Sequence, residues 1–178
     1  MSSPVSLPQR HLFVLRHAKS SWADAGMADH DRPLAPRGEE AVARLRRYVA
    51  GHGLSPALVL CSSARRTVLT CNGILPALPA DTTVEIEQDL YGASGSRVLA
   101  RLRRLDDDVP SVLVIGHNPG MHSLASMLAG AGDPELRGRL ATAFPTAALA
   151  TLAFHGSWAD LAPGSATLEA FVVPRELP

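Results

Sequence analysis

The chain has 178 residues, of which 46% are hydrophobic, and this is enough to bury a full core in one domain. Its 17 Lys and Arg residues balance 17 Asp and Glu residues, and the resulting zero net charge argues against a general nucleic-acid or membrane-surface binder. Two cysteines suit neither a disulfide framework nor a zinc site, and without a signal peptide or a long apolar run a cytoplasmic location is expected.

The predicted elements begin with a loose tail over residues 1–10, which hold two prolines and three serines. A short apolar run predicts a buried strand at about 11–16, and a long polar loop follows over 18–35. Pro36 fits the first turn of a helix whose apolar stripe ends near Gly51.

The remaining chain alternates between strands and helices. Strands are predicted where short apolar runs are bounded by turn residues, and helices where Ser, Asn or Pro opens an amphipathic stretch. The strands are expected at 57–61, 83–87, 111–116, 147–154 and 166–173. The helices are expected from Ser62-Ser63 to about 75, from Ser94 or Ser96, from Asn118-Pro119 and, as a short helix or a loop, over 133–140.

This alternation predicts an α/β fold, a three-layer sandwich with a mostly parallel central sheet flanked by helices, forming one domain over 11–178. Ligands bind at the carboxyl ends of the strands in such sheets. Three polar clusters are therefore expected at one rim of the sheet: Arg16-His17, the segment 62–66, and His117-Asn118.

Two histidines and two arginines at one rim suit a phosphoryl group, because arginine binds phosphate through two parallel hydrogen bonds and keeps its charge. Imidazole attacks phosphorus only when it is neutral, and Arg16 and Arg66 should depress the pKa of His17. His17 is predicted to accept the phosphoryl group, and His117 to donate to a phosphoryl oxygen. The arginines would supply the neutralising charge, so neither a metal nor a cofactor is expected.

Several motifs resemble the histidine phosphatase superfamily. They are RHAKS at 16–20, SSARRTVLT at 62–70 and VLVIGHNPG at 112–120. RHAKSSW followed by DRPL, together with LYGAS at 90–94 and FPTAAL at 144–149, is similar to the SixA-like phosphohistidine phosphatase branch.

The resemblance implies a phosphoglycerate mutase-like fold in which Arg16 and His17 are the first arginine and the nucleophile, and His117 is the second histidine. The family's S-x-x-x-R-x-x-x-T pattern has Ser62, Arg66 and Thr70 in register, which selects Arg66 over Arg65 as the phosphate ligand.

Other residues at the rim have less defined roles. Four of them could bind phosphate or line the pocket: Lys19, Ser20, Ser62 and Asn118. Many phosphomutase-like members carry a general-acid glutamate after the third strand. Here Glu87, Gln88 and Asp89 precede LYGAS, and Asp89 is the candidate for that role, although the register does not clearly supply the acid. A phosphorylated imidazole departs readily once protonated, so the absence of an obvious acid favours an N–P bond.

The predicted function is a metal-independent phosphatase that hydrolyses phosphohistidine on a protein through a covalent phosphohistidine intermediate. One alternative is a small-molecule phosphomonoesterase acting on a sugar or nucleotide phosphate. Another is a phosphoprotein-binding module without catalysis. The expected partner is a phosphorylated protein or a small phosphate ester, with neither nucleic acid nor membrane. The sequence leaves the physiological substrate and the oligomeric state open.

Overall fold

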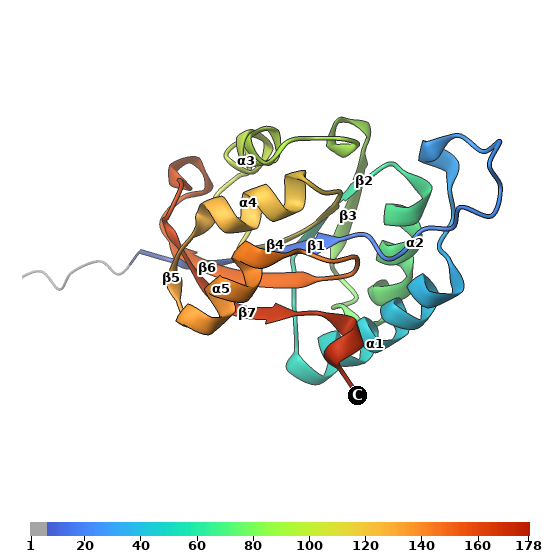
Figure 1. Ribbon diagram of the computed structural model, residues 1–178. Coiled ribbons are helices and arrows are strands. Elements are labelled where there is room, and N and C mark those ends of the chain that lie inside the picture. Colours follow the sequence, from blue (N-terminus) through green and yellow to red (C-terminus); the bar gives the residue numbers. More distant parts are fainter. Residues whose placement is uncertain (1–6) are drawn as a thin grey trace, which may run out of the picture.

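The computed structural model describes residues 7–178 and contains one seven-stranded sheet in the order β3-β2-β4-β1-β6-β7-β5 (Figure 1). The strands are β1 (Gln9–Arg16), β2 (Leu58–Ser62), β3 (Thr83–Glu87), β4 (Ser111–Gly116), β5 (Ala129–Gly132), β6 (Leu149–His155) and β7 (Ala166–Val172). Only β6 runs against its neighbours, because its pairings with β1 and β7 are antiparallel and every other pairing is parallel. The predicted mostly parallel α/β fold is confirmed.

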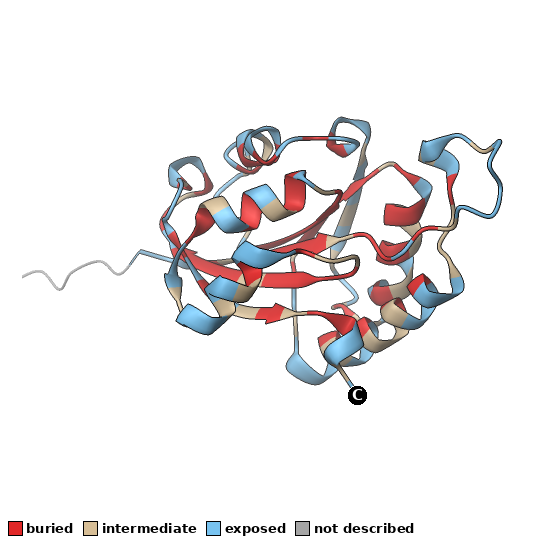
Figure 2. Cartoon of the chain, viewed as in Figure 1, coloured by how far each residue is buried: buried red, intermediate tan, exposed pale blue. Residues whose placement is uncertain are grey.

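Five helices cover the two faces of the sheet and make it the middle layer of three (Figure 1). One face carries α1 (Pro36–His52) and α2 (Arg65–Ile74), and the other carries α3 (Gly95–Leu102), α4 (Gly120–Leu128) and α5 (Pro134–Thr142). Alternate residues of β1 supply both cores: Leu12 and Val14 pack toward α3 and α4, whereas Phe13 and Leu15 pack toward α1 and α2. Strands β2 and β4 are buried along their length, and β1 is buried over residues 12–15 (Figure 2).

The beginning of the sheet differs from the prediction. Strand β1 starts at Gln9, inside the segment 1–10 that was expected to be a loose tail. Arg10 is buried, where its Nε donates to the carbonyl of Gly156 at 2.7 Å and its Nη2 lies 3.2 Å from an Asp107 carboxylate oxygen. The contacts that order these residues come from distant segments, which local composition does not encode. The rest of the expected tail, residues 1–6, lies outside the described residues.

Three other local predictions need correction. The N-caps of α2 and α4 are Ala64 and Pro119, not the predicted serines and asparagine. Strand β5 was missed because Ala129–Gly132 consists of small residues without strand propensity, and it forms only through pairing with β7. The 18–35 loop is not structureless, since Ser20 pairs with Leu34 and a 3₁₀ turn spans Asp29–Asp31.

The helices of residues 7–178 include none with the length and apolar character that crossing a membrane requires. The cytoplasmic location stays a prediction.

Candidate active site

Parallel pairing of neighbouring strands brings the two histidines together. Arg16, the last residue of β1, is in register with Gly116, the last residue of β4, so His17 and His117 leave the sheet side by side. Their ring centroids are 5.2 Å apart, and both residues are more than nine-tenths buried. Ser62 ends the next strand, β2, on the same rim. The predicted clusters therefore meet at one edge of the sheet.

The hydrogen bond of His17 defines which ring nitrogen is free. Its Nδ1 lies 2.7 Å from the carbonyl oxygen of Ala18. A carbonyl can only accept, so Nδ1 carries the proton and Nε2 of the neutral ring keeps its lone pair. Burial, with a smaller contribution from the charges of Arg66 and Arg16, lowers the pKa of His17 to about 4. The arginines were expected to be the main cause, but the larger contribution is burial.

Both nitrogens of His117 are already bonded, in contrast to those of His17. Its Nδ1 lies 3.3 Å from Nη2 of Arg66, which can only donate, so this nitrogen accepts. The proton is then on Nε2, which donates to the hydroxyl oxygen of Ser62 at 2.7 Å. Burial, followed by the nearby His17 and Arg66, lowers the pKa of His117 to about 3. His117 is therefore a neutral donor at pH 7.

Arg66 is held by Asp29, a residue of the polar loop over 18–35 for which no role was predicted. Its Nη1 donates to the carbonyl of Asp29 at 2.7 Å, and its Nη2 to a carboxylate oxygen of Asp29 at 3.1 Å. Tyr91 donates its hydroxyl to the same oxygen at 2.7 Å. The bond from Tyr91, helped by the charge of Arg66, lowers the pKa of the Asp29 carboxyl. Asp29 is ionised at neutral pH and lies beside the two histidines.

Arg16 and Asn118 are tied to the same backbone group. Nη1 of Arg16 and Nδ2 of Asn118 donate to the carbonyl of Phe144 at 3.1 and 2.8 Å. Asn118 Oδ1 also accepts from the backbone N–H of His122 at 3.3 Å, so the side chain supports the start of α4. Nε of Arg16 is buried and has no hydrogen-bond partner within residues 7–178. A buried N–H without an acceptor costs free energy, and an anionic oxygen would relieve that cost.

Ser20 anchors the loop above the site. Its hydroxyl accepts from Nη2 of the buried Arg32 at 2.8 Å, and Nε of Arg32 donates to the carbonyl of Ser21 at 2.8 Å. The guanidinium of Arg32 also stacks on Trp22, 3.1 Å from the ring centroid. These contacts hold the loop that carries Asp29, whereas Lys19 is exposed at the rim.

Within residues 7–178, no hydrogen bond or ion pair joins Asp89 to either histidine. Asp89 belongs to the 3₁₀ turn Gln88–Leu90 and lines a groove of about 790 Å³ beside α3, together with Arg97, Arg101 and Arg104. The side chain from this region that reaches the site is Tyr91, whose ring centroid is 5.5 Å from that of His117. Tyr91 lies in the LYGAS segment that resembles the family, but no sequence pattern connects Tyr91 or Asp29 to Arg66, because only the folded chain brings them together.

Within residues 7–178, no cluster of three or more His, Cys, Asp or Glu side chains is arranged to hold a metal ion. The donors around the histidines are guanidinium, hydroxyl and backbone N–H groups, which suit an anion.

Comparison with known proteins identifies the class. The sequence model described as "Histidine phosphatase superfamily (branch 1)" matches residues 12–94. An uncharacterised protein of Mycobacterium tuberculosis is 39% identical over 163 residues, which cover 90% of this chain and all of the relative. The chain belongs to the histidine phosphatase superfamily, and it is a phosphatase.

Solved structures indicate the branch. The protein assigned as phosphohistidine phosphatase SixA from Nakamurella multipartitia is 29% identical, with a TM-score of 0.81, and the match covers 95% of this chain and 98% of that one. The protein histidine phosphatase SixA complexed with tungstate is 25% identical, with a TM-score of 0.73 and coverages of 93% and 97%. The chain is therefore SixA-like. Phosphoglycerate mutase from Bacillus anthracis, 15% identical with a TM-score of 0.61 and 93% of each chain covered, shares the fold alone.

Proposed function

We propose that this phosphatase hydrolyses phosphohistidine on a protein and that His17 carries the phosphoryl group between the two half-reactions. The main support for this proposal is the hydrogen bond from Nδ1–H of His17 to the Ala18 carbonyl. With Nδ1 protonated in a neutral ring, Nε2 has a free lone pair. A nucleophile must be unprotonated and must be held in one orientation, and this bond meets both conditions.

The groups around His17 can bind the phosphoryl oxygens. Arg16 offers a buried Nε without a partner among the described residues, and Arg66 is a second cation at the same rim. Ser62 accepts from Nε2–H of His117 and keeps its own hydroxyl proton to donate, and a phosphoryl oxygen that displaces Ser62 would accept the Nε2–H of His117. Donors fixed in place before the reaction stabilise developing charge without reorganisation. The tungstate complex of the similar SixA supports binding of a tetrahedral oxyanion.

The first half-reaction exchanges one P–N bond for another. The Nε2 lone pair of His17 forms a bond to phosphorus while the bond from phosphorus to the substrate imidazole breaks, and the electron pair leaves with that imidazole. A substrate imidazole protonated on its second nitrogen departs as a neutral molecule. Water then attacks phosphorus, the electron pair of the Nε2–P bond returns to His17, and both water protons stay on the released phosphate.

The chemistry of the leaving group favours this substrate over a phosphate ester. An alcohol departing as an alkoxide needs a proton donor, and the carboxyl group beside the histidines is Asp29, whose lowered pKa makes it a poor acid. The exchange of one phosphoimidazole for another needs no such donor. The site therefore suits an N–P bond better than a sugar or nucleotide phosphate.

A substrate panel tests the proposal. Wild type and His17→Ala are each assayed on a phosphohistidine peptide, on p-nitrophenyl phosphate and on sugar phosphates. The proposal expects turnover of the phosphohistidine peptide well above that of the esters, and none by His17→Ala. Faster turnover of sugar phosphates than of the peptide would replace it with the small-molecule alternative.

A further inference from the structure

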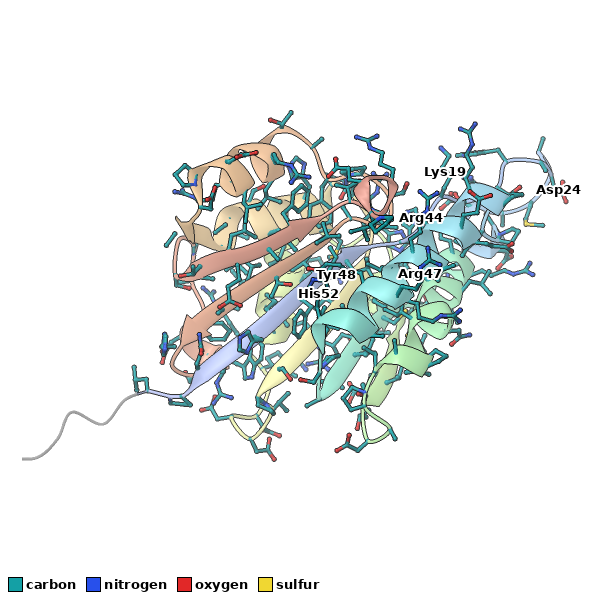
Figure 3. The ribbon with its side chains drawn as sticks, turned by 90° about the horizontal axis from the view of Figure 1, so that it is seen from below. Lys19, Asp24, Arg44, Arg47, Tyr48 and His52 are labelled. Carbon is teal, nitrogen blue, oxygen red and sulfur yellow. The ribbon has the colours of Figure 1, made fainter. Side chains whose placement is uncertain are left out.

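A second cationic site lies on the same rim as the histidines. Lys19, Arg37 and Arg175 line a cavity of about 340 Å³ and come from three separate parts of the chain. Lys19 follows β1, Arg37 lies in the first turn of α1, and Arg175 follows β7. Strands β1 and β7 run in the same direction, so the residues that follow them lie at the same rim of the sheet. Helix α1 begins after the loop that follows β1, so Lys19, Arg37 and Arg175 all belong to this rim. Figure 3 shows Lys19 near the part of α1 that carries Arg44, whereas His52 marks the other end.

The charge of this cavity is unbalanced. All three cations are exposed, and none forms an ion pair with another residue of 7–178. None of the described residues that line the cavity is acidic. Glu176, the neighbour of Arg175, is paired with Arg139 instead. The first turn of α1 has no side-chain cap, and its acidic residue, Glu39, lines a different pocket, so the backbone N–H groups at this end add to the positive field. Three like charges facing one cavity repel one another unless an anion lies between them.

The cavity shares a wall with the catalytic cluster. Pro145 and Thr146 line it, and they directly follow Phe144, whose carbonyl holds Arg16 and Asn118. On the other side, Lys19 is two residues from His17, and its backbone carbonyl accepts from the N–H of Ala35, just before α1. A substrate with its phosphoryl group on His17 therefore has this cavity as a neighbour.

We propose that Lys19, Arg37 and Arg175 form a subsite for a second anionic group of the substrate, separate from the phosphoryl group that is transferred. This inference deepens the proposed function and rests on it. In a phosphohistidine protein the second group is a carboxylate of an Asp or Glu near the phosphohistidine. In a small substrate it would be a second phosphate. Carboxylate and phosphate are both anions that arginine binds through two parallel hydrogen bonds.

Two pairs of substrates test the subsite. The first pair is a phosphohistidine peptide with flanking Asp and Glu residues and the same peptide with Asn and Gln. The second pair is a sugar bisphosphate and the monophosphate of the same sugar. Wild type is compared with Arg37→Gln, with Arg175→Gln and with Arg137→Gln, which removes the same charge from an exposed position on α5, across the sheet.

The subsite predicts that wild type prefers the acidic peptide and that Arg37→Gln and Arg175→Gln each reduce kcat/KM for it by about five-fold. Turnover of the Asn and Gln peptide should not change, and Arg137→Gln should behave as wild type on both. The same pattern confined to the sugar pair would keep the subsite and assign it to small substrates.

The two proposals can fail separately. If wild type turns over neither peptide, the phosphohistidine proposal fails, and the sugar pair still tests the subsite. The subsite is contradicted if wild type prefers neither the acidic peptide nor the bisphosphate, or if a preference survives in Arg37→Gln and Arg175→Gln. An equal loss of kcat/KM in Arg137→Gln would also contradict the subsite, because the preference for the acidic substrate would then come from the overall charge of the protein.

Discussion

The two buried histidines of the candidate site, His17 and His117, occupy equivalent positions but have opposite hydrogen-bonding patterns. Each follows a buried parallel strand, each is buried, and the pKa of each is lowered mainly by burial. The Nδ1–H group of His17 donates a hydrogen bond to a backbone carbonyl, and its Nε2 stays free. His117 accepts a hydrogen bond at Nδ1 from Arg66, and its Nε2–H group donates one to Ser62.

The position of a histidine in this fold therefore does not determine its chemical role. The strands bring two similar rings to one edge, and the groups bonded to each ring select its tautomer. A ring with a free lone pair can attack phosphorus. The lone pair on Nδ1 of His117 is taken by Arg66, so this ring can offer only its Nε2–H, which a phosphoryl oxygen can accept in place of Ser62. We therefore propose that His17 makes the nucleophilic attack and that His117 stabilises the phosphoryl oxygens.

The largest effect is expected from His17→Ala. Without the Nε2 lone pair no phosphoenzyme can form, so turnover of the phosphohistidine peptide should fall to the level of buffer. Circular dichroism and thermal unfolding provide the control that the variant is folded. If the folded His17→Ala variant kept more than a small fraction of wild-type turnover, His17 would not be the nucleophile and its role would not differ from that of His117.

His117→Ala should be slower than wild type by roughly 10²–10³ in kcat but still active, because it loses a donor to the phosphoryl oxygens and keeps the nucleophile. Single-turnover kinetics on the same peptide measures this loss. If His117→Ala were as inactive as His17→Ala, the two histidines would act as one unit and the comparison would be wrong.

Both histidines should stay neutral well below their ordinary pKa of 6.5. Since the pKa of His17 is about 4, kcat/KM should be independent of this group above about pH 5 and fall about tenfold per pH unit below 4. Stability should decrease as pH falls from 6.5 toward 4, because only the unfolded histidines take up protons there. NMR titration of the two rings measures this directly, and midpoints near 6.5 would contradict the burial argument.

Asp29→Asn sharpens the role of Arg66. Asparagine can still accept from the guanidinium, and the backbone carbonyl contact is retained, so the main change is the loss of one negative charge beside the phosphate site. Vanadate should bind up to about five-fold more tightly, the range for a partly exposed charge pair. Inhibition constants measure the change, and weaker binding would mean that the charge of Asp29 is needed to orient Arg66.

The smallest effect is expected from chelators. With arginines as the neutralising groups, EDTA should leave kcat unchanged. Activity that is lost in EDTA and restored by a divalent ion would overturn the metal-free mechanism.

Much of this arrangement could be predicted from the sequence, for identifiable physical reasons. The apolar runs at 11–16 and 111–116 end abruptly in Arg-His and Gly-His, and parallel strands deliver such residues to one edge. The pattern therefore predicts both the parallel sheet and the position of the two histidines at one edge of it. The resemblance to a known family selected Arg66 over its neighbour.

The long-range contacts could not be predicted. Asp29 reaches Arg66 and Tyr91 only because the 18–35 loop folds back, held by the buried Arg32 and by Ser20. The tautomers depend on which atoms lie against each ring, and the sequence contains no pattern for that. Strand β5 likewise depends on a partner strand rather than on its own residues.

The central claim is that the phosphoryl group rests on His17. Rapid quench of wild type during turnover of a ³²P-labelled phosphohistidine substrate, followed by proteolysis and peptide sequencing, tests it most directly. We predict an alkali-stable, acid-labile label on the peptide that contains His17, with a weaker label at the same position in His117→Ala and none in His17→Ala. A label on the peptide that contains His117 would contradict the assignment of roles.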